Sequence, residues 1–349
     1  MAKESTNKRK ILYALGAAVV VIAAIAAYFG GALYGTFATD KEEHIIYIAE
    51  GESPDSVKAK VESVADASKF QTFQKLAERK GYYDNIRPGR YDIGSGTSTL
   101  SVFRNLRNGN QAPVKLTIPP LHTVDPLARH LGKKLMCDSA EYAKALKDST
   151  LLAKYGLKRE TAICLFMQNT YEVYWTSNGE KLLDRMYKEY QNYWNKSRLA
   201  KLDEITKGFT REQAITLASI IERETNNKAE KPTIAGLYIN RLHKGMKLQA
   251  CPTVIFAVGD FTMRRVLNRH LETDSPYNTY KYEGLPPGPI YIPSPESLDA
   301  VLNYDHTDYL FMCAKEDFSG THNFASTGAE HEQNAQRYQK ALNERGLKK

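Results

Sequence analysis

Two glutamates, Glu222 and Glu224, stand two residues apart at the end of the apolar run LASIIERET. A carboxyl group that is buried among apolar side chains has a raised pKa and stays protonated near neutral pH, as a general acid requires. On a helix, Glu224 would lie between Ile220 on one side and Leu217 on the other, whereas Glu222 would lie across the same apolar stripe. This geometry favours Glu224 only slightly. The alternative is that both are solvated charges at a helix end.

The segment that carries the pair has a clear helix start. Thr210 can cap the first turn, Gln213 completes a capping box three residues later, and apolar residues then follow at helical spacing. A second helix is expected downstream, with Pro232 in its first turn and Gly245 at its end. Both helices belong to the part of the chain that must position the glutamates.

A membrane-spanning helix is predicted near the N-terminus. Residues 11–37 contain no charged side chain, and about 20 apolar residues suffice to cross the hydrocarbon core. The basic cluster at residues 8–10 then places residues 1–10 in the cytoplasm by the positive-inside rule, with the chain beyond the linker 38–43 on the far side. A cleaved signal peptide is the alternative, although its apolar core is usually about 7–15 residues. Either interpretation makes the working part extracytoplasmic.

Composition narrows the function classes. The chain has 349 residues, 42% of them apolar and 25% charged, with a formal net charge of +8, so a folded protein of two or three modules is expected. No zinc finger, aromatic RNA-binding motif or basic helix supports a nucleic-acid partner. An acidic polymer of another kind suits the charge equally well.

The cysteines do not form a metal-binding pattern. They are scattered, without a CxxC pair, so a zinc site is not expected, while an oxidising compartment would permit one or two disulfides. All of them could equally be small buried apolar residues. The cysteines are Cys137, Cys164, Cys251 and Cys313.

The chain beyond the linker divides into three predicted regions. Residues 44–112 read as a small module of strand, two helices, strand and a further helix, which resembles the LysM-like domain that precedes the catalytic domain in one family of cell-wall enzymes. Residues 113–207 are expected to be mainly helical and to connect it to a catalytic domain at 208–349. The fold class is therefore α+β, with a mixed α/β catalytic domain. In that domain the Glu224 helix should pack against strands at 248–258 and 308–314, and a helix should cover about 328–343.

Several short motifs follow the glutamate pair in a fixed order. They are INRL, LQACPTV, YNTY and GLPPG, at 239–242, 248–254, 277–280 and 284–288. With LASIIERET, they resemble the endolytic murein transglycosylases, the YceG-like family, in content, order and spacing. The resemblance runs from the membrane anchor to the C-terminal GTHNFASTGAEHEQN. It implies that Glu224 is the catalytic residue and that Glu222 supports it or binds substrate.

The resemblance also implies a chemistry in which one carboxyl group suffices. Glu224 would protonate the glycosidic oxygen between muramic acid and glucosamine, then take the proton of the muramic C6 hydroxyl while a 1,6-anhydro ring closes. No cofactor and no metal are implied. A hydrolase would instead need a second carboxylate facing Glu224. Candidates for that second group are Asp260, Glu272 and Asp274.

Residues of the neighbouring motifs could stabilise the transition state by hydrogen bonding to the sugar, or could instead fix turns and fill the core. These candidates are Gln249, Thr253, Asn278, Thr279 and Tyr280. Three cations could attract the carboxylates of the substrate, although solvated charges at a helix end explain them as well. These cations are Arg241, Lys244 and Lys247. His322 and His331 are interpreted as structural or substrate-contacting, because the family needs no metal.

Two departures from the family pattern bear on the wall of the cleft. Gln168 and Asn169 stand where relatives commonly have Pro-Asp, and PPLHTVD, at 119–125, replaces a usual Glu-Gly turn. The loop Glu283–Pro289 is rich in proline and glycine, so it reads as a rigid wall rather than a reacting group.

The resulting hypothesis is a lytic transglycosylase of the bacterial inner membrane, anchored through residues 11–37, that cuts nascent peptidoglycan glycan strands internally. The resemblance further implies a partnership with peptidoglycan synthases. The alternative is a catalytically inactive protein that binds the wall and acts as a scaffold for its synthesis.

Overall fold

The computed structural model describes residues 2–38, 44–94, 96–205 and 208–346, with side chains from residue 12 onward. These residues form two units, which are described separately: Met1–Val114 with Tyr174–Thr176, and Lys115–Val173 with Ser177–Lys349. Most of the predicted linker 38–43 lies outside the described residues.

The first unit begins with a long apolar helix, α1 (Ala2–Tyr34). Its segment Leu12–Tyr34 has a mean hydropathy of 2.3 and none of it is buried, so it is long and apolar enough to cross a membrane. The predicted span, 11–37, ends too late. Phe37 is fully buried in the module that follows, with its ring 5.9 Å from that of Phe73.

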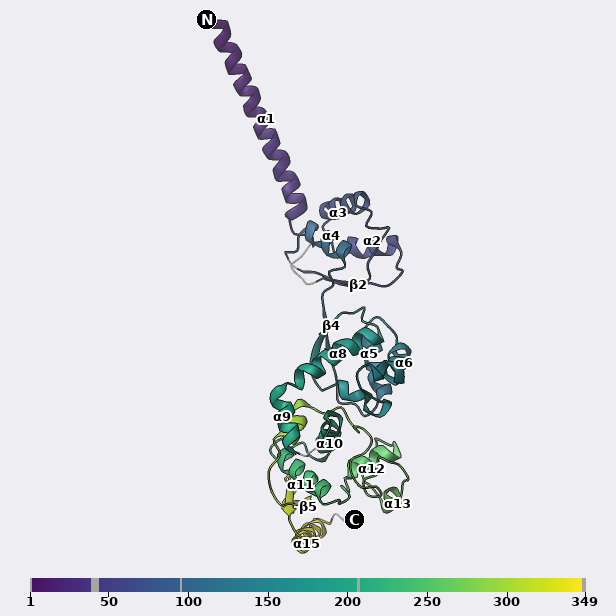
Figure 1. The fold of residues 1–349 in the computed structure, drawn as a ribbon. Helices are drawn as coiled ribbons and strands as arrows, with labels where there is room; N and C mark the ends of the chain where they lie inside the picture. Colours follow the sequence, from purple (N-terminus) through teal and green to yellow (C-terminus); the bar gives the residue numbers. More distant parts are fainter. Residues whose placement is uncertain (1, 39–43, 95, 206–207, 347–349) are drawn as a thin grey trace. The chain divides into compact units, whose positions relative to one another are not determined.

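The rest of the first unit has the predicted order of strand, two helices, strand and helix. Strands β1 (His44–Ile48) and β2 (Gly89–Ile93) pair antiparallel, with Ile46 opposite Tyr91. Figure 1 shows the helices on one side of this pair; they are α2 (Pro54–Glu62), α3 (Ala67–Arg79) and α4 (Thr99–Asn108). The likeness to a LysM domain stays a prediction.

The second unit starts with a mainly helical region, as expected. Strand β4 (Thr170–Val173) pairs with β3 (Val114–Thr117), and the Thr117 and Thr170 hydroxyls are 2.9 Å apart. The helices of this region are α5 (Val124–Lys134), α6 (Ser139–Lys147), α7 (Ser149–Ala153), the 3-10 helix η1 (Arg159–Leu165), α8 (Gly179–Tyr193) and α9 (Lys196–Ile205).

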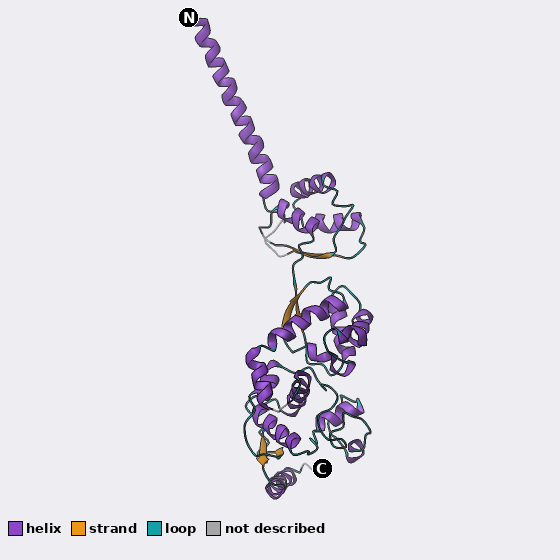
Figure 2. Ribbon diagram, in the orientation of Figure 1, coloured by secondary structure: helices purple, strands orange, loops and turns teal. Residues whose placement is uncertain are grey.

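The glutamate pair is carried by α10 (Arg211–Glu224), which has the predicted capping box between Thr210 and Gln213. Its middle is buried from Ala214 to Ile221, so α10 is the central helix of the unit. Around it lie α11 (Lys231–His243), α12 (Cys251–Val258), α13 (Asn268–Leu271), α14 (Pro295–Leu302), β5 (Phe311–Ala314), β6 (His322–Ala325) and α15 (Gly328–Glu344). Figure 2 shows that helices dominate and strands are short, a mixed α and β fold.

The strand predicted at 248–258 is wrong, because residues 251–258 form α12. Pro252 occupies the first turn of this helix, and Gly259 ends it in the left-handed conformation at φ 80°. These two signals outweigh the β-branched run between them. The strand predicted within 308–314 is confirmed as β5, which pairs antiparallel with β6.

The segment 290–293 joins the two halves of the second unit. The backbone N–H of Ile290 donates to the Ser219 hydroxyl of α10 at 3.0 Å. The N–H of Ile292 donates to the carbonyl of Leu121 at 2.9 Å, and the N–H of Gln168 donates to the carbonyl of Pro293 at 3.2 Å. Residues 115–205 and 208–346 therefore share one hydrophobic core.

Candidate active site

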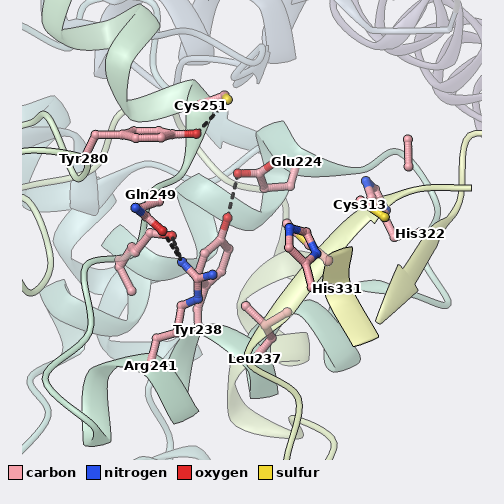
Figure 3. A pocket seen from close by; sticks show the side chains of 13 residues that line it. Glu224, Leu237, Tyr238, Arg241, Gln249, Cys251, Tyr280, Cys313, His322 and His331 are labelled. Atoms are coloured by element: carbon pink, nitrogen blue, oxygen red, sulfur yellow. Dashed lines mark hydrogen bonds between the residues drawn. The ribbon is translucent and has the colours of Figure 1, made fainter. Parts of the chain in front are cut away.

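A cavity of about 320 Å³ opens at the C-terminal end of α10. In Figure 3, Tyr238 points toward Glu224, with Tyr280 and Cys251 on one side and the histidines His322 and His331 on the other. The cavity is lined by side chains from α10, α11, the segment 248–251, the loop that contains Tyr280, β5, β6 and α15. The lining residues are Glu224, Leu237, Tyr238, Arg241, Leu248, Gln249, Cys251, Tyr280, Met312, Cys313, Ala314, His322 and His331.

The Glu224 carboxyl group has a raised pKa, as a general acid requires. Burial raises its pKa above the ordinary value, although a hydrogen bond from Tyr238 and the nearby charge of His322 oppose the shift. The Tyr238 hydroxyl donates to Glu224 Oε1 at 2.7 Å. Burial and the charge of Glu224 raise the pKa of Tyr238 well above its ordinary value, so this tyrosine keeps its proton and remains a donor.

Glu222, two residues earlier, lies in the opposite environment. Its Oε2 accepts from the Lys231 ammonium at 3.1 Å and from the Ser294 hydroxyl at 2.6 Å, and it also accepts from Ser297. Gln168 donates to Oε1 at 3.4 Å. Burial would raise the pKa of Glu222, but the hydrogen bonds from Ser294, Ser297 and Lys231, together with the positive charge of Lys231, outweigh it and lower the pKa.

The structure therefore separates two glutamates that the sequence leaves nearly equivalent. Glu222 is held as a carboxylate among donors and does not line the cavity, whereas Glu224 faces the cavity with a raised pKa. Divergent pKa values within a pair of carboxyl groups are typical of sites that need one acid and one permanent charge.

Of the five substrate-binding residues predicted besides Glu222, Gln249 and Tyr280 line the cavity with Glu224. The other three are buried behind it. The Thr253 and Thr279 hydroxyls are 2.8 Å apart, and Asn278 Nδ2 donates to two backbone carbonyls at 2.8 and 2.9 Å. These side chains hold the segment that presents Gln249 and Tyr280.

Gln249 adopts a left-handed backbone conformation with φ 53°, which is unusual for a residue other than glycine. Such strain persists where the surrounding structure fixes the residue. The N–H of Gln249 donates to the carbonyl of Thr279 at 3.1 Å, and its side-chain oxygen accepts from Arg241 at 3.3 Å.

Arg241 differs from the expectation of a solvated charge. It is 7% exposed, and it donates to the carbonyls of Leu310 at 2.6 Å and Leu248 at 2.9 Å. Lys244 and Lys247 are exposed, as solvated charges would be.

Tyr238 is a site residue that the sequence analysis does not identify. Its spacing of three residues from Arg241 on α11 is the signal that could have placed both on one face.

His322, one of the two histidines that line the cavity, is also anchored outside it. The Glu230 carboxylate accepts from the His322 backbone N–H at 2.7 Å and lies 3.2 Å from its Nδ1. Among the side chains that the structure describes, no group of three or more His, Cys, Asp or Glu residues is arranged to hold a metal ion. The four cysteines are free thiols, and only Cys164 is fully buried.

The three acidic residues that a hydrolytic mechanism could have used do not line the cavity. Asp260, Glu272 and Asp274 are all exposed, and Asp274 pairs with Lys281 at 3.0 Å. Of the described residues that line the cavity, Glu224 alone carries a carboxyl group.

Comparison with known proteins places this chain in a family. The sequence profile of the YceG-like family matches residues 46–337. A Bacillus subtilis protein named endolytic murein transglycosylase is 45% identical over 131 residues, which cover 38% of this chain and 36% of that protein. A Streptococcus pneumoniae protein of the same name is 26% identical over 85% of this chain and 58% of its own length. The chain thus spans little more than half of these relatives at most.

A solved structure agrees with the sequence comparison. The crystal structure of a YceG-like protein from Listeria monocytogenes matches with a TM-score of 0.55 and 27% identity, covering 84% of this chain and 99% of that one. The chain belongs to the YceG-like family.

Proposed function

We propose that this protein is a membrane-anchored endolytic lytic transglycosylase that cleaves the β-1,4 bond between N-acetylmuramic acid and N-acetylglucosamine in peptidoglycan. The observation that carries the proposal is the state of Glu224, which lines the cavity with a raised pKa and a hydrogen bond from Tyr238. The names of the related proteins from Bacillus subtilis and Streptococcus pneumoniae support the same activity.

In this mechanism, protonated Glu224 gives its proton to the glycosidic oxygen as the bond to the anomeric carbon breaks. The resulting carboxylate then takes the proton of the muramic C6 hydroxyl, whose oxygen attacks the anomeric carbon to close the 1,6-anhydro ring. The proton count balances, no water is consumed, and Glu224 ends protonated. Tyr238 stabilises the intermediate carboxylate through its hydrogen bond, which strengthens when the acceptor is charged.

The remaining predicted site residues take two roles in this proposal. Gln249 and Tyr280 contact the sugar, since both line the cavity. Glu222, Thr253, Asn278 and Thr279 act as positioning residues, because their polar atoms are engaged inside the protein. Glu222 ties α10 to α11 and α14 through Lys231 and Ser294.

The proposed location follows from the apolar segment Leu12–Tyr34 of α1 and the basic residues 8–10 that precede this segment. We propose a single-pass protein of the bacterial inner membrane with its catalytic part outside the cytoplasm, where the residues 44–112 module would hold the glycan strand. Peptidoglycan synthases are the proposed partners, by analogy with the family.

The test is a digest of purified peptidoglycan by the full chain in detergent, with mass spectrometry of the released muropeptides. Ends carrying 1,6-anhydro-muramic acid, one water lighter than hydrolysed ends, are the expected result. Reducing ends of ordinary mass would contradict the transglycosylase mechanism. Retained wall binding without any cleavage would instead favour the scaffold.

A further inference from the structure

A second cavity, of about 160 Å³, also reaches Glu224. It shares only Glu224 and Cys251 with the larger cavity, so these two residues lie on the border between them. Its other lining residues are His122, Arg223, Pro252 and Ile255. An enzyme that cuts a polymer internally must hold a sugar on each side of the broken bond, and two cavities that meet at the acid suit that need.

His122 gives this cavity an aromatic wall with a free acceptor. Its ring stacks on that of Phe261 at 4.0 Å between centroids and lies 4.7 Å from Tyr291. His122 Nδ1 is 3.0 Å from the carbonyl oxygen of Ile290, so Nδ1 carries the proton. Burial lowers the pKa of His122, the hydrogen bond to Ile290 opposes this shift, and the adjacent charge of Arg223 adds to it, so a neutral ring is favoured near neutral pH. Nε2 is left as an acceptor with no hydrogen-bond partner among the described residues.

Arg223 gives the cavity a cation that is not neutralised. Its side chain is exposed, with the guanidinium 5.0 Å from the centre of the Tyr291 ring. No carboxylate of the described residues pairs with it. A guanidinium held against an aromatic ring keeps its forked donors available, and this fork matches the two oxygens of a carboxylate.

Both features belong to positions that the acid–base mechanism does not use. Arg223 separates the two glutamates, and His122 comes from PPLHTVD, one of the two places where the sequence departs from the family pattern. The departure therefore supplies a side chain to the cavity rather than only reshaping a turn.

We propose that this second cavity is a sugar subsite for a residue of the glycan strand that carries a carboxylate, with Arg223 pairing with the carboxylate and His122 lying against the sugar ring. This inference rests on the proposed function, because it assigns part of the same substrate. The ligand class is an acidic amino sugar, a muramoyl residue from a part of the strand without a stem peptide, because an attached peptide would convert the lactyl carboxylate to an amide.

Binding to the full chain in detergent tests the subsite, with Glu224→Gln present throughout so that no ligand is cleaved. The ligands are peptide-free glycan oligosaccharides with free lactyl carboxylates, and the same oligosaccharides with those groups converted to amides. Adding Arg223→Gln should weaken binding of the carboxylate form about tenfold, because one charge-assisted pair is lost. Binding of the amide form should weaken less than about twofold, because the amide carries no charge for Arg223 to pair with.

Arg211→Gln is the matched control, because Arg211 is on the same helix and its guanidinium lies 5.8 Å from the centre of the Tyr190 ring. It should leave both affinities unchanged, and thermal melting checks that each variant is folded. Equal losses for the two ligands with Arg223→Gln, or no loss, would overturn the proposal. Because the measurement is of binding, its result is independent of whether the protein cleaves peptidoglycan, which the muropeptide digest decides.

Discussion

At the level of single residues, Glu222 and Glu224 should affect stability in opposite directions. The folded pKa of Glu222 is lowered, so its contribution is present above the ordinary value of 4.5 and is lost as the pH falls through the folded value. The folded pKa of Glu224 is raised, so stability is lost as the pH rises from 4.5 through its folded value.

Glu222→Gln should therefore lower the free energy of unfolding at pH 7, by about 3 kcal/mol, because it leaves the buried Lys231 unpaired. Glu224→Gln should raise it at the same pH, because it removes a carboxylate from a buried site. Denaturant unfolding of both variants between pH 4 and pH 8 would show this. Destabilisation by Glu224→Gln at pH 7 that equals or exceeds that by Glu222→Gln would contradict the assignment.

Tyr238 should set the pH range of activity. Its hydrogen bond lowers the pKa of Glu224, so Tyr238→Phe should raise that pKa and move the alkaline fall of kcat/KM to higher pH. The measurement is the rate of anhydro-muropeptide release against pH. Tyr155→Phe is the control. The Tyr155 hydroxyl also donates to a carboxylate, that of Asp184 at 2.9 Å, but neither residue lines the cavity. A fall that stays in place, or moves to lower pH, would disprove this role.

At the level of elements, the loop Glu283–Pro289 should tolerate no side chain at Gly288. A Cβ there would lie 2.0 Å from the backbone oxygen of Glu160, so the loop or η1 would have to move. Gly288→Ala should cost about 2 kcal/mol of stability or more and reduce activity, because the next residues support α10 through Ser219.

Gly328→Ala is the matched control for this loop. A Cβ at Gly328, in the first turn of α15, meets nothing within 4 Å. It should leave the free energy of unfolding unchanged or slightly higher. Comparable losses in the two variants, measured by denaturant unfolding, would show that the loop is not rigidly packed.

Elements with strong local signals could be predicted from the sequence. The capping box at Thr210, the first-turn Pro232 and the apolar run of α1 all act within a few residues, and each produced the expected helix. The strand prediction at 251–258 is wrong because a short apolar stretch suits a strand and a buried helix equally. Its flanking Pro252 and Gly259 were the better signals.

The contents of the site were only partly predictable. Glu224 could be ranked above Glu222 only slightly from helical geometry, because the partners that distinguish them lie on other elements. Ser294 and Ser297 are about 70 residues further along the chain from Glu222, and no local pattern relates them to it. The burial of Arg241 likewise depends on carbonyls such as that of Leu310, just before β5.

At the level of the whole molecule, the end of α1 decides where a soluble form can begin. Phe37 follows the helix and is fully buried in the first unit, so a chain that starts at residue 40 would lack part of that core. A form of residues 35–349 should be soluble without detergent and should melt at the temperature of the full chain.

The contribution of Phe37 can be tested in the full chain. Phe37→Ala should cost about 3 kcal/mol in the first unit, because it leaves a cavity beside Phe73. Phe29→Ala is the control, since Phe29 is 59% exposed on α1. Equal melting temperatures of the two variants in detergent would show that Phe37 does not stabilise the first unit.

In the proposed mechanism, Glu224 alone is the acid and base, and Glu222 only positions it. The most direct measurement is the rate of anhydro-muropeptide release by Glu224→Gln and Glu222→Gln, at equal concentrations of folded protein. Glu224→Gln should lose about 10³-fold or more, and Glu222→Gln should retain activity within about tenfold of the natural protein. The reverse order, with Glu224→Gln folded and active, would show that Glu224 is not the acid.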